Sequence, residues 1–521
     1  MTARPSGPVP VLPGCHPDPS VCRAGEEYVM VTSSFALWPG LPVHRSTDLV
    51  HWELAGHVLS SRAALDALAL DDLDLSDGVW APTVRHHRGT FYVVFSTARD
   101  RRGAGTFVCT AQAPEGPWSD PVAVDAPGID PSLFFDGDRC WLTACRDATD
   151  PAASGPGELW MRELKLDPLE VVGPEHVLWH GAVHGAWVEA PHVFERDGRY
   201  HLIAAEGGTE RHHAVTAAVA DHVTGPWRTD PRSPLLTHRH LGTESGVQNV
   251  GHADVVDAVD GTSWAVVLGT RPVDGSHVMG REVFLVPVRW DAGGPVFAPG
   301  HGRLPERLDL LAEPHRKPAD RWVSLRGPVE HAVHSTAAGR THVLAPRPDP
   351  LTGRGTPALV GRHQDAHRFS FSAELELGSL PRAARCGIVA HQHERAFLAL
   401  DVVTEDGAVG FELVLQSPAG RRVLAHRAHG PLSRGDRALL ELRGDERSYT
   451  ASVQLEDGAR SELGSVAHHE LATERVGGFL GVLLALHAQG AATERPVAFG
   501  RVSYDAVGEE ECACASSRVS G

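Results

Sequence analysis

The chain has 521 residues, of which 42% are hydrophobic, and it contains 54 glycines and 38 prolines. That length exceeds the ~250–300 residues at which a single hydrophobic core stops growing, so we expect two or three turn-rich domains built mainly from β-strands. A formal net charge of −18 at pH 7 without a cluster of lysines and arginines argues against a nucleic-acid or anionic-membrane partner, because both partners require a basic surface.

The N-terminal stretch MTARPSGPVPVLPG lacks the apolar segment of ~7–15 residues that a secretory signal requires, which predicts a cytoplasmic protein. No apolar stretch approaches the ~18 residues that a membrane span needs, so we expect no membrane partner. The eight cysteines are scattered along the chain and are expected to be reduced in the cytoplasm.

One pattern recurs five times in the first part of the chain. Each copy has a two-residue opening, a short strand, a turn that contains glycine and a second apolar strand, and the copies begin at Asp18, Ala81, Asp130, Ala190 and Ala253. The turns contain Gly25, Gly89, Gly137, Gly198 and Gly261, where a positive φ is cheap only for glycine. A spacing of about 50–65 residues is typical of propeller blades with loop insertions. The pattern therefore predicts an all-β fold that begins with a five-bladed β-propeller over residues 1–315.

The openings of the five copies are the candidate functional residues. In a β-propeller the first strand of each blade lines a central channel, so the openings are expected to converge at the axis. They supply three carboxylates, an indole and an imidazole, from Asp18, Asp130, Glu189, Trp80 and His252. Singly, an Asp before a proline is ordinary turn chemistry. Three like charges at one axis cost stability, however, and are kept mainly where their pKa values have to differ, so we interpret the set as a catalytic site.

A carboxyl pair suits the cleavage of sugar acetals, because one group protonates the leaving oxygen while the other activates water or attacks the anomeric carbon. The sequence contains no GxSxG elbow, no GxxxxGK[ST] phosphate loop and no HExxH zinc helix that would indicate a competing chemistry.

The stretches GCHPDPSVCR, WAPTVRHHRGTFYVVFST, APGIDPSLFFD, EAPHVFERDGRYHLIAAEGGT, NVGHADVV and MGREVFLVPVRW resemble glycoside hydrolase family 43, especially its β-xylosidase and α-L-arabinofuranosidase members. The resemblance implies an inverting single displacement at the sugar. In it, Asp18 matches the general base, Glu189 the general acid and Asp130 the carboxylate that raises the pKa of the acid and orients it.

The same resemblance implies the surroundings of the carboxylates. Arg281 matches an arginine that reaches the sugar hydroxyls, and Phe35 and Trp80 match the aromatic wall of the sugar pocket. His252 matches an axial histidine that faces a calcium ion or a water cluster in some members. The reaction requires no cofactor, and the resemblance leaves open a structural calcium in the channel near His252.

Three departures from the family pattern concern the pocket wall. Ala190 stands where the family usually has glycine, Cys15 stands where an aromatic residue is common, and the stretch CRD from Cys145 to Asp147 falls where xylosidase-type members often have a tryptophan. The departures leave the carboxylates intact, so they bear on which sugar is cleaved and leave the choice between xylose and arabinose open.

A second domain follows the repeats. Short alternating segments separated by turn residues predict a β-sandwich over residues 316–508, and residues 509–521 are predicted to be a disordered tail. The sandwich resembles the concanavalin-like domain of xylosidase-type members, in which a loop places a phenylalanine at the mouth of the propeller. Phe479 is the candidate for that position, and a core residue is the alternative interpretation.

We therefore expect an exo-acting glycosidase whose partner is a small pentose oligosaccharide. One alternative is a fructan-cleaving hydrolase, which also joins a propeller to a sandwich but opens on an Asn-Asp-Pro-Asn motif that this chain lacks. The other alternative is a sugar-binding propeller without catalysis, which has no reason to keep all three carboxylates. The sequence leaves the oligomeric state open and is compatible with a homo-oligomer.

Overall fold

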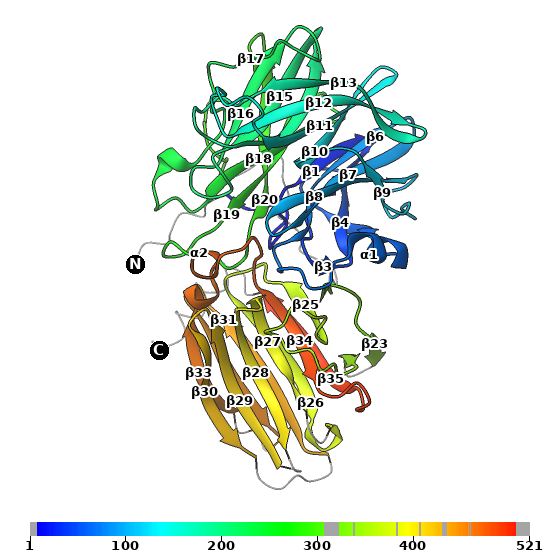
Figure 1. Cartoon of the computed structure of the whole chain (residues 1–521). Coiled ribbons are helices and arrows are strands. Elements are labelled where there is room, and N and C mark those ends of the chain that lie inside the picture. Colours follow the sequence, from blue (N-terminus) through cyan, green and yellow to red (C-terminus); the bar gives the residue numbers. More distant parts are fainter. Residues whose placement is uncertain are drawn as a thin grey trace. The chain divides into compact units, whose positions relative to one another are not determined.

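Two compact units make up the computed structural model shown in Figure 1, the first formed by Met1–Pro272 with Arg281–Ala319 and the second by Val273–Gly280 with Asp320–Gly521. The structure describes residues 8–306, 322–336, 339–381, 384–405, 408–429, 435–456, 458 and 460–506. The predicted boundary at residue 315 and the predicted tail at 509–521 lie outside these residues.

Strands dominate both units, as the sequence predicts. The described residues contain two short α-helices, α1 (Arg62–Leu68) and α2 (Thr473–Val476), together with single turns of 3-10 helix at Arg239–Leu241, Leu377–Ser379 and His468–Leu471. Within those residues, no helix has both the length and the apolar character that crossing a membrane requires.

Within residues 8–306 the first unit contains five four-stranded antiparallel sheets, which we call blades I to V in chain order. Blade I contains β1 (Ser20–Ala24), β2 (Glu27–Val31), β4 (Gly40–Ser46) and β5 (Glu53–Leu59), and the short strand β3 (Leu37–Trp38) precedes β4. Blade II contains β6 (Gly78–His87), β7 (Thr90–Arg99), β8 (Arg102–Ala111) and β9 (Val122–Val124). Blade III contains β10 (Ile129–Asp136), β11 (Arg139–Asp147), β12 (Gly157–Leu166) and β13 (Leu169–Trp179).

Blade IV contains β14 (Val188–Arg196), β15 (Arg199–Glu206), β16 (Ala214–Ala220) and β17 (Arg228–Thr229), and blade V contains β18 (Gln248–Asp257), β19 (Ser263–Thr270), β20 (Glu282–Asp291) and β21 (Gly294–Phe297). The five glycines assigned to the turn between the first two strands all have a positive φ, between +61° and +85°. The prediction that these turns require glycine is confirmed.

The sheets close into a ring around their first strands. β1, β6, β10, β14 and β18 each lie against the first strands of both neighbouring blades, and β18 returns to β1. The chain reinforces the closure before blade I, where Leu12 bridges to Val283 in β20. The predicted five-bladed propeller is confirmed.

The hydrophobic core of this unit is divided among the gaps between blades. One cluster joins Val29 of blade I to Phe95 of blade II, and corresponding clusters fill the other gaps between successive blades. Because apolar side chains on both faces of every sheet are buried, the blades hold one another in register and leave the inner strand ends to carry polar groups.

The second unit is the predicted β-sandwich. Its seven-stranded sheet runs in the order β23-β24-β35-β26-β31-β32-β33 and its six-stranded sheet in the order β25-β34-β27-β28-β29-β30. The strands are β22 (Ser324–Leu325), β23 (His331–Thr336), β24 (Gly339–Leu344), β25 (Leu359–His363), β26 (Phe369–Glu376), β27 (Arg385–His393), β28 (Ala396–Glu405), β29 (Ala408–Ser417), β30 (Gly420–Ala428), β31 (Arg437–Gly444), β32 (Ser448–Leu455), β33 (Arg460–Ala467), β34 (Leu483–Gln489) and β35 (Val497–Ala506).

Alternation along the strands builds the sandwich core. In β26 every second side chain is buried, beginning with Phe369 and Phe371, and these residues pack with Leu400 and Phe411 of the other sheet. The alternation of RFSFSAELEL thus places its apolar residues on one face, as a half-buried strand requires.

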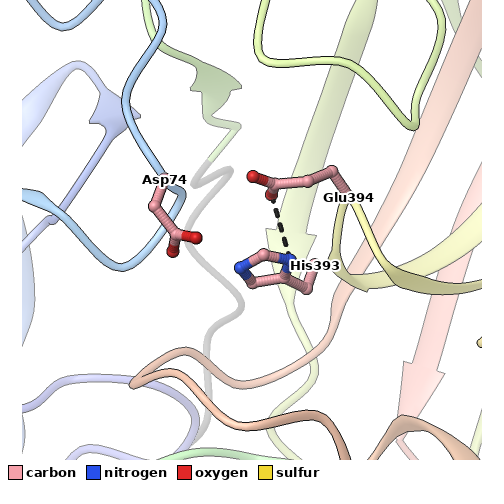
Figure 2. Close-up of side chains that lie close together, drawn as sticks. All are labelled: Asp74, His393 and Glu394. Carbon is pink, nitrogen blue, oxygen red and sulfur yellow. Dashed lines mark ion pairs between the residues drawn. The ribbon is translucent and has the colours of Figure 1, made fainter. Parts of the chain in front are cut away.

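An ion pair lies at the end of β27, where His393 Nδ1 is 3.2 Å from Glu394 Oε2 (Figure 2).

Candidate active site

The inner strands share one irregularity at the openings. In blades II to V the pairing with the second strand skips two residues, after Trp80, Ile129, Glu189 and Gly251. In blade I, β1 begins immediately after the corresponding pair. One residue at each of the five openings has a positive φ, namely Asp18, Ala81, Asp130, Ala190 and His252. Residues other than glycine rarely adopt this conformation, so the five openings are locally strained and redirect the chain at the channel.

The fifth copy is offset by one residue from the sequence alignment. The repeat pattern places Ala253 opposite Asp18, but the residue with the left-handed backbone is His252. The longer turn of this copy accounts for the offset, because the last pair of β18 and β19 is Asp257 with Ser263, whereas that of β14 and β15 is Arg196 with Arg199. Two aspartates and His252 therefore occupy equivalent positions, whereas Trp80 and Glu189 each come one residue earlier in their strands.

Asp18 is held by contacts on both of its carboxylate oxygens. Arg281 NH1 donates to Oδ1 at 2.7 Å, and the Ser33 hydroxyl donates to Oδ2 at 2.6 Å. The imidazole of His252 lies 3.6 Å from Oδ1. Burial raises the pKa of Asp18, but Arg281, His252 and Ser33 outweigh burial, so the pKa is lower than its ordinary value. Asp18 is therefore ionised at neutral pH, as a general base requires.

Ser33 connects this carboxylate to the next blade. Its hydroxyl oxygen accepts a hydrogen bond from the Ala81 backbone N–H at 2.7 Å while it donates to Asp18. Because the Ser33 oxygen accepts from the Ala81 N–H, its own proton is left to point at Asp18. The two bonds together hold the Asp18 side chain in place relative to blade II. The sequence pattern did not identify Ser33, and its place directly after β2 and Thr32 gives no signal of this role.

Arg281 enters the site from the residue before β20. Besides Asp18, NH1 donates to the Thr209 hydroxyl at 3.1 Å, and the guanidinium carbon lies 5.8 Å from the centroid of the Phe35 ring. Phe35 is 2% exposed, so its ring supports Arg281 from beneath. Trp80 is half-buried, and its indole N–H donates to the Ser76 carbonyl at 2.9 Å.

The HPDPS loop is tied to β20 next to Arg281. The His16 N–H donates to the Arg281 carbonyl at 2.8 Å, and the Gly14 N–H donates to Glu282 Oε1 at 3.0 Å. Glu282 is itself paired with Arg271, 2.7 Å from Nε to Oε2. These bonds fix Asp18 and Arg281 against each other although 263 positions separate them along the chain.

Asp130 and Glu189 form the acidic side of the site. Burial raises the pKa of Glu189 to about 7, and the charge of Asp18 adds to the rise, while Arg281 and Trp187 oppose it. Burial, followed by the charges of Glu189 and Asp18, raises the pKa of Asp130 well above its ordinary range. Two neighbouring carboxyl groups with raised pKa values share their charge, so a proton is retained on this side of the site near neutral pH.

The cysteine departures lie beneath the site. Cys145 is fully buried in β11, where it pairs with Ile129, and burial followed by the charges of Asp130 and Glu189 raises the pKa of its thiol. Cys15 is 3% exposed. Both cysteines therefore pack inside the protein, and their effect on the pocket wall stays a prediction.

His213 is a further buried residue that the repeat pattern missed. Its Nδ1 lies 3.0 Å from the Asn249 carbonyl, and burial lowers the pKa of its ring to about 3. A Cβ on Gly251 would lie 2.6 Å from the His213 ring, so Gly251 in the GHAD stretch leaves the space that the ring occupies. A glycine within a strand was the available signal, because it often marks a close approach.

Phe479 lies in the turn between α2 and β34 and is half-buried. Its contact with the substrate stays a prediction.

Comparisons with known proteins place this geometry in context. The family model described as Glycosyl hydrolases family 43 matches residues 8–296, and the model described as Beta xylosidase C-terminal Concanavalin A-like domain matches residues 315–505. A xylosidase/arabinosidase of Butyrivibrio fibrisolvens is 33% identical over 92% of this chain and 95% of its own. A non-reducing end alpha-L-arabinofuranosidase of Bacteroides ovatus is 30% identical over 92% of this chain and 91% of its own.

Solved structures show the same two-domain fold. The crystal structure of xylan beta-1,4-xylosidase from Bacillus halodurans superimposes with a TM-score of 0.85 and 26% identity, and covers 96% of this chain and 99% of its own. The similarity therefore spans both units of the chain.

Proposed function

The chain belongs to glycosyl hydrolases family 43 and is a glycoside hydrolase, and from that premise we propose that it is an inverting exo-glycosidase that releases xylose or arabinose from short pentose oligosaccharides. The observation that carries the proposal is the opposite shift of the pKa values of two carboxyl groups, the buried Asp18 and the half-buried Glu189. The pKa of Asp18 lies below its ordinary value, whereas the pKa of Glu189 is raised to about 7. A base that stays ionised and an acid that keeps its proton are the pair that glycoside hydrolysis needs.

In the proposed reaction, Asp18 accepts a proton from a water molecule as the water oxygen attacks the anomeric carbon. The bond between that carbon and the glycosidic oxygen breaks on the opposite side of the ring, and Glu189 gives its proton to the departing oxygen. The configuration at the anomeric carbon is inverted because a single displacement occurs. Solvent then returns the proton from Asp18 to Glu189.

Asp130 and Arg281 set the protonation states that this sequence of steps requires. Arg281 holds the charge of Asp18 through its contact with Oδ1, and Asp130 shares charge with Glu189 on the acidic side. We propose that Arg281 also donates to sugar hydroxyls, because a guanidinium presents several donors in one plane. Trp80 supplies a half-buried apolar surface suited to the C–H face of a sugar ring.

Relatives named xylosidase and arabinofuranosidase support the pentose assignment. Release of single sugars from chain ends would follow if Phe479 closes one side of the site, as the sequence resemblance implies. The partner in this proposal is a small oligosaccharide, and the acidic composition favours neither nucleic acid nor an anionic membrane.

The experiment compares hydrolysis of 4-nitrophenyl β-D-xylopyranoside and 4-nitrophenyl α-L-arabinofuranoside by wild type, Asp18→Ala and Glu189→Ala. Glu195→Ala is the matched control, because this exposed carboxylate lies on the same strand as Glu189. We expect wild type and Glu195→Ala to cleave at least one substrate at similar rates and Asp18→Ala to be inactive. NMR of the first product from the preferred substrate should show the inverted anomer. Retention, or full activity in Asp18→Ala, would refute the proposed mechanism.

A further inference from the structure

A second ring of polar side chains lies two residues farther along each inner strand. Side chains at alternate positions of a strand face the same side, so the residues two beyond the openings also face the channel. All five are at most 3% exposed: Ser20, Thr83, Ser132, His192 and Asp254. They contact one another across blades, with Ser20 Oγ donating to Asp254 Oδ2 at 2.7 Å and Ser132 Oγ lying 2.9 Å from His192 Nδ1.

The guanidinium of Arg85 joins this ring. Arg85 lies two residues beyond Thr83 in β6, and its NH1 and NH2 donate to the two oxygens of Asp254 at 2.8 and 3.2 Å. NH2 also lies 2.9 Å from His192 Nδ1, and NH1 donates to the Val84 carbonyl at 2.8 Å. A side chain from blade II thus bridges blades IV and V below the catalytic carboxylates.

These contacts use the groups that a metal ion would need. Asp254 Oδ2 accepts from Ser20, from the Val21 N–H and from Arg85, while Oδ1 accepts from Arg85 and from the Val255 N–H. Calcium requires about 6–8 oxygen ligands at 2.3–2.6 Å. The ring provides one carboxylate, already neutralised by a guanidinium, and a histidine nitrogen that calcium disfavours, so this donor set does not fit calcium.

We propose that Arg85 is the resident cation of this ring and takes the place that a calcium ion would have in the channel. A guanidinium keeps its charge at every accessible pH and matches a carboxylate with two parallel bonds. It neutralises Asp254, and together with Ser132 it occupies His192 Nδ1, so the His192 ring carries its proton on Nε2. Burial lowers the pKa of His192 to about 3, so the ring is neutral as this arrangement requires. The proposal concerns the channel and does not depend on which sugar is cleaved.

The wild-type protein provides the first test. After dialysis against EDTA and then against metal-free buffer, we expect the purified chain to contain no stoichiometric calcium by elemental analysis. Its thermal midpoint and its rate on the preferred aryl glycoside should be the same in EDTA and in calcium chloride. One calcium per chain that survives dialysis, or a thermal midpoint that falls in EDTA, would overturn the proposal without affecting the assignment of the catalytic carboxylates.

Variants of Arg85 provide the second test. Removing one partner of a buried ion pair is costly, so Arg85→Ala should lower the thermal midpoint by about 10 °C. Calcium should not recover that loss, because the side chains left behind offer one carboxylate, a histidine nitrogen and two serine hydroxyls, too few oxygen ligands for calcium. Arg85→Lys keeps the charge without the paired bonds and should fall between wild type and Arg85→Ala. Arg88→Ala is the control, because Arg88 is exposed beyond the same strand. An Arg85→Ala variant as stable as Arg88→Ala, or one whose stability calcium restores to that of wild type, would overturn the proposal.

Discussion

Arg281 NH1 lies 2.7 Å from Asp18 Oδ1, and this contact joins the first blade of the propeller to the last. Both side chains are at most 9% exposed, so the ion pair is shielded from water and its electrostatic effect is strong. Arg281 lowers the pKa of Asp18 and also opposes the rise of the Glu189 pKa. One guanidinium therefore influences both ends of the proposed pH range of activity.

Replacing Arg281 should displace the pH profile toward alkaline values. In Arg281→Met, the pKa of Asp18 rises because its cationic partner is lost, so the base is protonated at pH values where wild type is active and the acidic limb moves up. The pKa of Glu189 rises for the same reason, so the acid keeps its proton to higher pH and the basic limb also moves up. The measurement is kcat/KM against pH with an aryl glycoside. A loss of rate without movement of either limb would contradict this account.

Ser33→Ala should impair the base without removing it. The hydroxyl stabilises the ionised form of Asp18, so its loss raises the pKa of Asp18 and moves only the acidic limb of kcat/KM to higher pH. A hydrogen bond to a charged group contributes about 1.5–3 kcal/mol, which corresponds to a rate loss of roughly 10- to 100-fold if it is needed to orient Asp18. Ser46→Ala is the control, because the Ser46 hydroxyl donates to Asp48 at a turn of the same blade. An unchanged limb in Ser33→Ala would assign Ser33 a purely structural role.

Glu189→Gln should separate substrates by their leaving groups. A glutamine cannot donate the proton that an alkoxide leaving group needs, so hydrolysis of xylobiose or an arabino-oligosaccharide should fall by about 10²–10⁴-fold. The 2,4-dinitrophenolate group of a 2,4-dinitrophenyl glycoside departs without protonation, so hydrolysis of that substrate should be affected far less. The basic limb, which in wild type reflects the loss of the Glu189 proton near pH 7, should disappear from the profile. Equal losses on both substrates would show that Glu189 is not the acid.

The sequence predicted the blades more completely than the site. Glycine turns and apolar second strands are local patterns, so the sequence predicted the five copies and their order, and it singled out Asp18, Asp130 and Glu189 as candidates. The offset at His252 could not be predicted, because it depends on where the pairing of β18 with β19 ends and their turn begins. The cross-blade contacts of Ser33 and Arg85 were missed for a related reason. Each side chain finds its partner through ring closure, and nothing local in the sequence around Arg85 indicates that Asp254 lies beside it.

Gly128 should be more sensitive to substitution than the turn glycine of the same blade. Both Gly128 and Gly137 have a positive φ, so alanine at either position incurs a backbone cost of about 1 kcal/mol. At Gly128 the added Cβ would also lie 1.9 Å from the Cys145 carbonyl oxygen, whereas at Gly137 it meets nothing within 4 Å. Relief of that overlap requires movement of β11 or of the segment that leads into Asp130, so Gly128→Ala should lose about 3 kcal/mol or more. Thermal unfolding of the two variants measures the difference, and kcat tests its consequence, because displacement of Asp130 should slow Gly128→Ala alone. Equal stability of the two variants would show that the chain absorbs the added methyl group without disturbing the site.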